Sequence, residues 1–352
     1  MAAMNLESYP PVFRQQSTSP EVQAHSHSDD VAKEFIQEFH SIPVVDLQCL
    51  NLDKLAEACK NWGLFRLVNH GIPLTLLRQL QDHSKKIFSL SFESKKALVI
   101  SSPMSYFWGT PALTPSGDSL SRGSQNINWV EGFNVPVSQL SQFQARDPTL
   151  DSFRILLEEY GRHLTRIATT IFDAMAKTLN LNPEQSKTYL SESTGSIRVY
   201  RYPRCSSANE TFGMEAHTDS SVLSILNQEQ VGGFELLKDD KWLQIEPIPE
   251  TLVLNLGDML QAISNDEYKS VKHRVKPNKY GERYSICYFV FPSEGSVIQS
   301  SKYKPFTYND FRAQVQQDIR TMGFKVGLDR FKFKQIESQL QAETSNGEDE
   351  GV

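Results

Sequence analysis

A histidine and an aspartate two residues apart, His217 and Asp219, form the pattern in this chain that is best suited to holding a metal ion. Alternate side chains of a β-strand point to the same face, so this imidazole and this carboxylate could bind one ion together. The spacing alone carries little weight, because His27 and Asp29 repeat it in a polar segment. A metal site therefore requires a third ligand and a fitting structural context.

His273 is the candidate third ligand. It follows a glycine-turn segment at 254–258, after which a returning strand could bring it opposite the first pair. Two histidines and one carboxylate leave positions open on an octahedral ion, as in non-haem Fe(II) oxygenases, although ligand preference alone would also admit zinc or manganese. A structural zinc site usually has four protein ligands, and the sequence pattern offers no fourth here. We therefore expect an open, catalytic metal site.

Arg283 and Ser285 follow His273 by ten and twelve residues and would share one strand face. The same Arg-x-Ser spacing occurs at Arg122 and Arg204, so spacing does not single out Arg283. Its position does, because it lies on an expected core strand just after the third ligand. A buried arginine requires an anion, and a forked guanidinium beside a hydroxyl suits a carboxylate. We predict a carboxylate-binding subsite near the metal.

Short β-branched and aromatic segments between 197 and 291 must position these residues. Glycines and Asn/Asp turns separate the segments at regular intervals, which is typical of an antiparallel sandwich or barrel. Apolar residues at helical spacing predict a long helix within 151–180, and shorter helices are predicted over 52–62 and 74–88. The expected fold is mainly β with flanking α-helices.

The two ends of the chain are polar. Residues 1–38 carry too little apolar surface to offset the entropy of ordering, so they are expected to form a flexible arm. The acidic residues 339–352 are expected to form a disordered tail.

Composition excludes several classes of protein. The chain has 352 residues, with 36 Lys and Arg against 42 Asp and Glu, so no overall basic field favours nucleic acid as a partner. No apolar stretch is long enough to cross a membrane, and the four scattered cysteines favour reduced thiols. We expect a cytoplasmic protein, with the nucleus as a second compartment, that binds a small molecule and is a monomer by default.

The chain resembles a plant-type Fe(II)- and 2-oxoglutarate-dependent dioxygenase from about 42 to 324. The resemblance rests on six segments: IPVVDL at 42–47, WGLFRLVNHGIP at 62–73, EAHTD at 215–219, VGGFE at 231–235, NLGD at 255–258 and KHRV at 272–275. It implies a distorted double-stranded β-helix, or jelly roll, over 151–338, and a mixed helical region over 39–150 that is integral to the fold.

The resemblance also implies ligands and roles. Fe(II) would lie on His217, Asp219 and His273, and the distal carboxylate of 2-oxoglutarate on Arg283 and Ser285. Tyr202 falls where the family usually places a further tyrosine that contacts this cosubstrate. Dioxygen is then the second cosubstrate and ascorbate the reductant. Tyr200 stands where the family commonly has asparagine, a departure that could alter how the cosubstrate is held or the outcome of the reaction.

The segments 126–134, 269–275 and 306–311 resemble gibberellin oxidases, in particular those like the 2-oxidases. This implies hydroxylation of a small plant metabolite, with a gibberellin-type diterpenoid acid ranked first and a flavonoid, an alkaloid or another specialised metabolite as the alternative. A hormone-binding protein without turnover and a hydrolytic zinc enzyme are alternatives from other classes. The candidate pocket residues are aromatic: Tyr106, Trp108, Trp129, Phe133 and Phe291.

Overall fold

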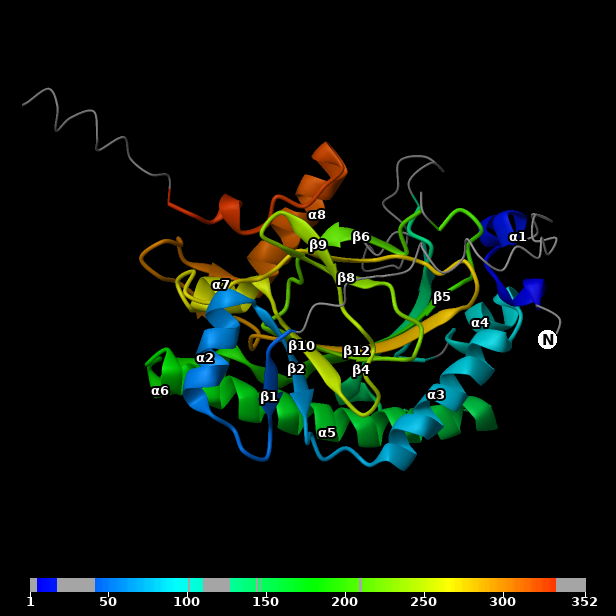
Figure 1. The fold of residues 1–352 in the computed structure, drawn as a ribbon, viewed down its shortest axis with the longest axis horizontal. Helices are drawn as coiled ribbons and strands as arrows, with labels where there is room; N and C mark the ends of the chain where they lie inside the picture. The colour runs from blue at the N-terminus through cyan, green and yellow to red at the C-terminus, as the bar shows by residue number, and fades with distance from the viewer. Residues whose placement is uncertain are drawn as a thin grey trace, which may run out of the picture.

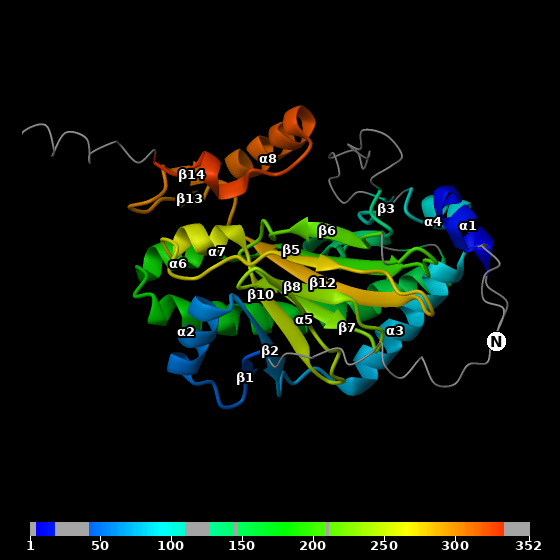
Figure 2. The same cartoon turned by 45° about the horizontal axis from the view of Figure 1, so that its top comes forward.

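The computed structural model describes residues 5–17, 42–100, 102–109, 127–143, 145, 147–208 and 211–333. In this part of the chain a large sheet of eight strands and a small sheet of four strands enclose the site, and the longest helix lies against the outer face of the large sheet (Figures 1 and 2). A short two-stranded sheet lies beside the last helix.

The strands of the large sheet, in spatial order, are β1 (Val44–Asp46), β2 (Leu64–Val68), β10 (Leu252–Leu256), β7 (Leu223–Gln228), β12 (Arg283–Phe291), β5 (Ser191–Tyr202), β4 (Glu131–Pro136) and β3 (Ser105–Trp108). The small sheet runs β6 (Met214–His217), β11 (His273–Val275), β8 (Phe234–Lys238) and β9 (Lys241–Gln244). The third sheet pairs β13 (Val297–Ile298) with β14 (Phe306–Thr307). Every pair is antiparallel except β1 with β2.

The helices are α1 (Pro11–Ser17), α2 (Leu52–Asn61), α3 (Leu74–Ser89), α4 (Phe92–Leu98), α5 (Pro148–Thr178), α6 (Pro183–Tyr189), α7 (Asp258–Ile263) and α8 (Tyr308–Met322). Three short 3-10 turns accompany them: η1 (Leu6–Ser8), η2 (Val137–Gln139) and η3 (Gly327–Arg330). The helices predicted over 52–62, 74–88 and 151–180 are confirmed as α2, α3 and α5.

Helix α5 begins at Pro148 because Asp147 caps it: the Asp147 side chain accepts from the backbone N–H of Leu150 at 2.9 Å. Its apolar stripe is buried against β5, β7 and β12 and against helices α2 and α3. The large sheet therefore has one face packed on helices, which leaves its other face for the small sheet and the site.

Strand β12 shows how the two faces differ. Ile286, Tyr288 and Val290 belong to the hydrophobic core on the helix side. Arg283 and Cys287, on the alternate positions, line the space between the sheets. The alternation of side chains along β12 thus separates residues that stabilise the fold from residues that line the site.

Strands β1 to β4 all come from the region before α5, yet they lie in the same sheet as β5, β7, β10 and β12. Strand β2 pairs with β10, and β4 pairs with β5 along six residues. These pairings join strands from the region before α5 to the rest of the large sheet.

Gly63 turns the chain from α2 into β2. Its φ is +63°, in the left-handed region that favours glycine. A Cβ atom there would lie 2.1 Å from the carbonyl oxygen of Lys269. No side chain can be accommodated at this turn without moving the segment that leads to β11.

Residues 5–17 differ from the flexible arm expected over 1–38. Tyr9 and Phe13 are buried, at 1% and 0% exposed, and the Phe13 ring lies 4.2 Å from that of Trp129 between centroids. The apolar residues of this short segment suffice because the folded domain offers them a ready apolar surface. The other residues of the arm, and all of the expected tail, lie outside the described residues.

A buried ion network holds this N-terminal segment. Lys95 of α4 donates to the Ser8 carbonyl at 2.5 Å and also to Glu131 of β4. Arg201 of β5 pairs with the same carboxylate and donates to the Ser8 carbonyl at 2.8 Å. All three charged side chains are at most 2% exposed, so each depends on the others for its partner.

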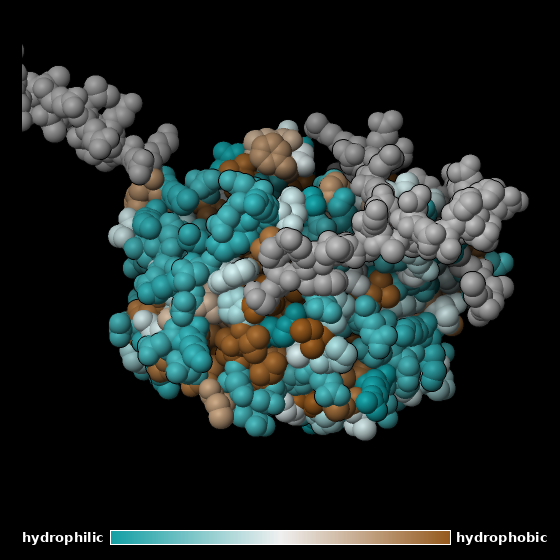
Figure 3. All heavy atoms as spheres, viewed as in Figure 1, coloured by the Kyte–Doolittle hydropathy of each residue, from teal (hydrophilic) through white to brown (hydrophobic). Residues whose placement is uncertain are grey.

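Hydrophilic residues cover most of the face seen in Figure 3, with hydrophobic residues gathered near its centre. None of the described helices is both long enough and apolar enough to span a membrane.

Candidate active site

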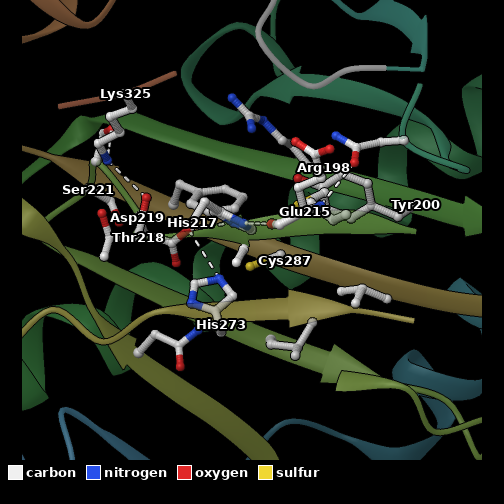
Figure 4. A pocket seen from close by; sticks show the side chains of 18 of the residues that line it. Arg198, Tyr200, Glu215, His217, Thr218, Asp219, Ser221, His273, Cys287 and Lys325 are labelled. Atoms are coloured by element: carbon white, nitrogen blue, oxygen red, sulfur yellow. Dashed lines mark hydrogen bonds and ion pairs between the residues drawn. The ribbon is translucent and has the colours of Figure 1, made fainter. Parts of the chain in front are cut away.

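The three predicted metal ligands converge at the small sheet. His217 ends β6 and His273 begins β11, and the register of this antiparallel pair sets the two residues opposite each other. Asp219 follows β6 by two residues and is 7% exposed. One candidate ligand atom from each residue lies within 4.8 Å of the other two (Figure 4). The structure therefore brings the three predicted ligands together.

Backbone hydrogen bonds orient both imidazoles. His217 Nδ1 lies 2.7 Å from the Glu215 carbonyl and His273 Nδ1 lies 3.2 Å from the Val271 carbonyl. A proton on each Nδ1 leaves Nε2 as the free acceptor, and the two Nε2 atoms lie 3.7 and 3.6 Å from Asp219 Oδ1. The three donor atoms therefore face one point.

The protonation states also suit a cation. Burial, and then the adjacent His273, lower the pKa of His217 to about 4, so its imidazole is neutral and its lone pair available. Burial alone would raise the pKa of Asp219, but the neighbouring imidazoles and the Ser224 hydroxyl outweigh it and the pKa is lowered. Ser224 of β7 donates to the second carboxylate oxygen of Asp219. The large sheet thus fixes a ligand carried by the small sheet.

Arg283 begins β12 and is 0% exposed, yet no carboxylate among the described residues forms an ion pair with it. Its NH2 group donates to Gln228 Oε1 at 3.1 Å, while Nε and NH1 are buried without a hydrogen-bond partner. Burial lowers its pKa. A buried guanidinium with two free donors fits a carboxylate ligand, so this observation supports 2-oxoglutarate in the same cavity as the metal.

Tyr202 and Ser285 lie where the prediction places them, beside Arg283. Tyr202 pairs with Arg283 across β5 and β12, and its ring centroid lies 5.1 Å from the guanidinium carbon. Burial raises the pKa of Tyr202 to about 12, so its hydroxyl stays protonated and can donate. Ser285 is 3% exposed and also lines the cavity.

Tyr200, the departure from the family pattern, stacks on Tyr202 with 6.0 Å between ring centroids. On its other side it meets Phe107 edge-on at 5.8 Å. Burial raises its pKa, which keeps the phenol neutral. Its ring therefore forms part of the cavity wall beside Tyr202, where the smaller asparagine side chain would leave open space.

The cavity between the sheets has a volume of about 390 Å³, within the size range of small-molecule sites. Its walls come from the large sheet, the small sheet and α8 together with the segment that follows it. In Figure 4 the metal-ligand cluster lies between Lys325 on one side and Arg198 and Tyr200 on the other.

Of the five aromatic residues predicted to line the pocket, only Phe291 does so among the described lining residues. Tyr106 and Phe133 pack together at 5.2 Å between centroids in the core on the helix side. Trp108 and Trp129 form a separate cluster with α1. The prediction was wrong for these four because strand alternation and the packed N-terminal segment turn them away from the site.

Sequence reasoning missed several residues of the site. Ser224 was one, since nothing in its surroundings signals a bond to Asp219. Asn128, whose Oδ1 accepts from the Glu215 backbone N–H at 2.9 Å, was a second. Arg198 was a third, but its spacing of two from Tyr200 could have placed it on the same strand face.

Comparison with known proteins agrees with this geometry. The family model described as the 2OG-Fe(II) oxygenase superfamily matches residues 193–292. The model described as non-haem dioxygenase in morphine synthesis N-terminal matches residues 42–152. The first match contains all three predicted metal ligands and Arg283.

Similar curated proteins cover most of the chain. Gibberellin 2-beta-dioxygenase 6 of Oryza sativa subsp. japonica is 35% identical over 312 residues, which cover 82% of this chain and 84% of that protein. Gibberellin 2-beta-dioxygenase 8 of Arabidopsis thaliana is 35% identical and covers 79% and 80%. Protein DMR6-LIKE OXYGENASE 1 of Arabidopsis thaliana is 32% identical and covers 73% and 74%.

Among solved structures, JOX2 in complex with 2OG, Fe, and JA superposes with a TM-score of 0.70 at 26% identity, covering 85% of this chain and 91% of that chain. The rice dioxygenase for auxin oxidation, at 23% identity and a TM-score of 0.68, shares the fold. These matches confirm the predicted jelly-roll fold. The chain belongs to the 2OG-Fe(II) oxygenase superfamily, and it is an Fe(II)- and 2-oxoglutarate-dependent dioxygenase.

Proposed function

We propose that His217, Asp219 and His273 bind the Fe(II) of this dioxygenase, and that Arg283, with Ser285 and Tyr202, binds the distal carboxylate of 2-oxoglutarate. The observation that carries this assignment is the buried Arg283, whose two partnerless donors lie in the same cavity as the metal-ligand cluster. The cosubstrate carboxylate would supply the negative charge that no described residue places beside Arg283.

The iron and 2-oxoglutarate together supply an oxidant formed from dioxygen, with succinate and carbon dioxide released. The chain's own residues position the reactants. The Glu215 and Val271 carbonyls keep both imidazoles turned to one point, and Ser224 holds the Asp219 carboxylate. The cavity walls orient the substrate, so that oxidation is directed at one substrate bond.

The substrate we propose is a small plant metabolite, with a gibberellin-type diterpenoid acid as the first choice and hydroxylation as the outcome. Relatives named gibberellin 2-beta-dioxygenases, at 35% identity over about four-fifths of the chain, support this choice. A 1-aminocyclopropane-1-carboxylate oxidase of Arabidopsis thaliana is similar at 30% identity. The test must therefore include substrates beyond gibberellins, such as flavonoids and alkaloids.

The deciding experiment supplies the purified protein with Fe(II), 2-oxoglutarate and ascorbate and offers it a panel of gibberellins, flavonoids and alkaloids. Succinate and oxidised products are measured by mass spectrometry. We expect succinate formation to be stimulated by a gibberellin-type acid. Absence of stimulation by any compound in a broad panel would point to a small-molecule binding protein without turnover.

The metal assignment is tested with Asp219→Ala. Loss of residues that merely support metal ligands costs about 10–100-fold, so loss of a ligand should lower turnover by more than about 100-fold. The matched control is Asp173→Ala on the exposed face of α5, which should retain activity. Iron binding, measured by metal analysis of the folded protein, should fall with the first variant and not with the second. Wild-type turnover by Asp219→Ala would refute the assignment.

A further inference from the structure

Three arginine or lysine side chains are among the described residues that line the cavity: Arg198, Arg283 and Lys325. Lys325 has its ammonium group fully engaged. It contacts the Asp258 carboxylate at 2.5 Å, the Thr218 carbonyl at 2.9 Å and the Ser220 hydroxyl at 2.9 Å. With Arg283 assigned to the cosubstrate, Arg198 is the remaining cation.

Arg198 has no carboxylate partner among the described residues. Its Nε donates to Asn134 Oδ1 at 3.2 Å, and its guanidinium carbon lies 4.9 Å from the centroid of the Phe289 ring. Both contacts fix the side chain, and neither neutralises its charge. Arg201, three residues along the same strand but on the other face, pairs with Glu131 and Glu282. Within the described part of the chain, the structural Arg201 thus has carboxylate partners and the cavity-lining Arg198 has none.

The sheet register separates the two cavity arginines. Arg283 lies opposite Tyr202, whereas Arg198 lies opposite Cys287, four positions further along β12. At roughly 3.3 Å per residue, the two positions are about 13 Å apart along the strands. Arg283 and Arg198 therefore place positive charge at two separate parts of one cavity. In Figure 4 the predicted metal ligands lie between Lys325 and Arg198.

Arg198 also donates to the Tyr200 phenol, which is neutral and leaves the charge of the guanidinium in place. The cavity wall beyond these contacts is mostly apolar. Phe289 and Phe291 line this part of β12, the Phe291 ring stacks on Tyr308 at 4.6 Å, and Val315 and Ile319 of α8 complete the wall. An apolar surface with a single uncompensated cation complements a largely apolar molecule that carries one anionic group.

We propose that Arg198 binds a carboxylate of the substrate, and that it selects apolar carboxylic acids over their uncharged analogues. This inference rests on the proposed function, since it places the substrate in the cavity that holds the metal and 2-oxoglutarate. Arg198 is then a specificity-determining residue, and Arg283 serves the cosubstrate.

The test compares Arg198→Gln with the wild type on a gibberellin-type diterpenoid acid and on its methyl ester. Losing a charge-assisted hydrogen bond should raise KM for the acid by about 10–100-fold. The ester, which lacks the anion, should be used equally poorly by both proteins. The KM for 2-oxoglutarate should change by less than about twofold, because Arg283 is untouched.

The matched control is Arg78→Gln, which removes the same charge from the exposed face of α3 and should leave both KM values unchanged. Arg198→Lys should recover part of the selectivity for the acid, and thermal unfolding of each variant reports on the fold. A KM for the acid that stays unchanged in Arg198→Gln, or a loss that is equal for acid and ester, would overturn the proposal.

A failure of the proposed function is distinguishable from a failure of this inference. If no substrate stimulates succinate formation, calorimetric binding of the acid and the ester still reports on Arg198. The wild type should bind the acid at least about tenfold more tightly than the ester, and Arg198→Gln should bind both alike. Equal binding of acid and ester by the wild type would refute the role of Arg198 even where turnover is present.

Discussion

At the scale of single residues, two buried arginines of the large sheet differ in whether a carboxylate of the protein neutralises their charge. Arg201 pairs with Glu131 and Glu282 and joins elements of the fold. Arg283 is equally buried and has no carboxylate partner among the described residues, so in the free protein its desolvation is not offset. The contrast marks Arg283 as a residue retained for a ligand.

Substitution by methionine should therefore act in opposite directions at the two positions. Arg283→Met removes an uncompensated charge, so without 2-oxoglutarate it should be at least as stable as the wild type, but 2-oxoglutarate should no longer stabilise it. Arg201→Met leaves Glu131 without one of its partners and should lose about 3–5 kcal/mol. Urea unfolding with and without 2-oxoglutarate measures both effects. Retention of full stabilisation by 2-oxoglutarate in Arg283→Met would show that the cosubstrate lies elsewhere.

The candidate metal ligands and Arg283 could be proposed from the sequence because their residue types are chemically demanding, and because strand alternation sets the spacing within the pairs His217 and Asp219, and Arg283 and Ser285. The sequence did not show that Trp108 and Trp129 pack away from the cavity. Their burial depends on Phe13, which is far away along the chain, and on which face of each strand is turned to the helices. Such information exists only once the sheets have paired.

At the scale of elements, the turn at Gly63 couples α2 and β2 to the segment before β11. The close approach to the Lys269 carbonyl leaves no room for a Cβ atom. Lys269 lies four residues before His273, so packing at this turn supports the position of a proposed metal ligand. The sequence predicts a helix over 52–62, directly before this glycine, but the contact between Gly63 and Lys269 could not be read from local spacing.

Gly63→Ala should destabilise the protein far more than Gly295→Ala. Both glycines have positive φ, +63° and +76°, so both variants share a backbone penalty of about 1 kcal/mol. Nothing lies within 4 Å of a Cβ at Gly295, whereas the Lys269 carbonyl lies 2.1 Å from one at Gly63. The difference in unfolding free energy between the variants isolates this contact. Equal losses of unfolding free energy in the two variants would mean that the segment before β11 shifts to make room for the Cβ atom at no measurable loss of stability.

At the scale of the whole molecule, the buried network around Glu131 joins the N-terminal segment, the helical region and the jelly roll. Lys95 belongs to α4, Glu131 to β4, Arg201 to β5 and the Ser8 carbonyl to the N-terminal segment. Parts that are distant in the sequence thus share one set of charges, and their unfolding should be coupled.

This network gives the stability a defined dependence on pH. Burial lowers the pKa of Lys95 to about 8, whereas in the unfolded chain it returns to its ordinary value of 10.5. Between these values the unfolded chain holds a proton that the folded protein has lost, so the free energy of unfolding rises with pH. Tyr9 and Tyr106 oppose this rise only near pH 10, because burial raises their pKa values.

Urea unfolding at about pH 7.5 and about pH 9 should therefore show a gain in stability for the wild type that Lys95→Met lacks. Burial raises the pKa of the Cys59 and Cys287 thiols, which reduces stability near pH 9 equally in both proteins, so the difference between them isolates Lys95. Lys96→Met, at the exposed neighbouring position of α4, is the control and should keep the gain. A gain of the same size in Lys95→Met would assign the effect to another group.

Strand β5 carries Arg198, Tyr200 and Tyr202 toward the cavity, and Ile197, Val199 and Arg201 toward the structural layers. Neighbouring positions of one strand thus have different tasks. Arg198 can be substituted to change which substrate is bound, whereas Tyr202 remains tied to the proposed cosubstrate and the second face to folding. A change of substrate at Arg198 therefore need not reduce the stability that the second face supplies.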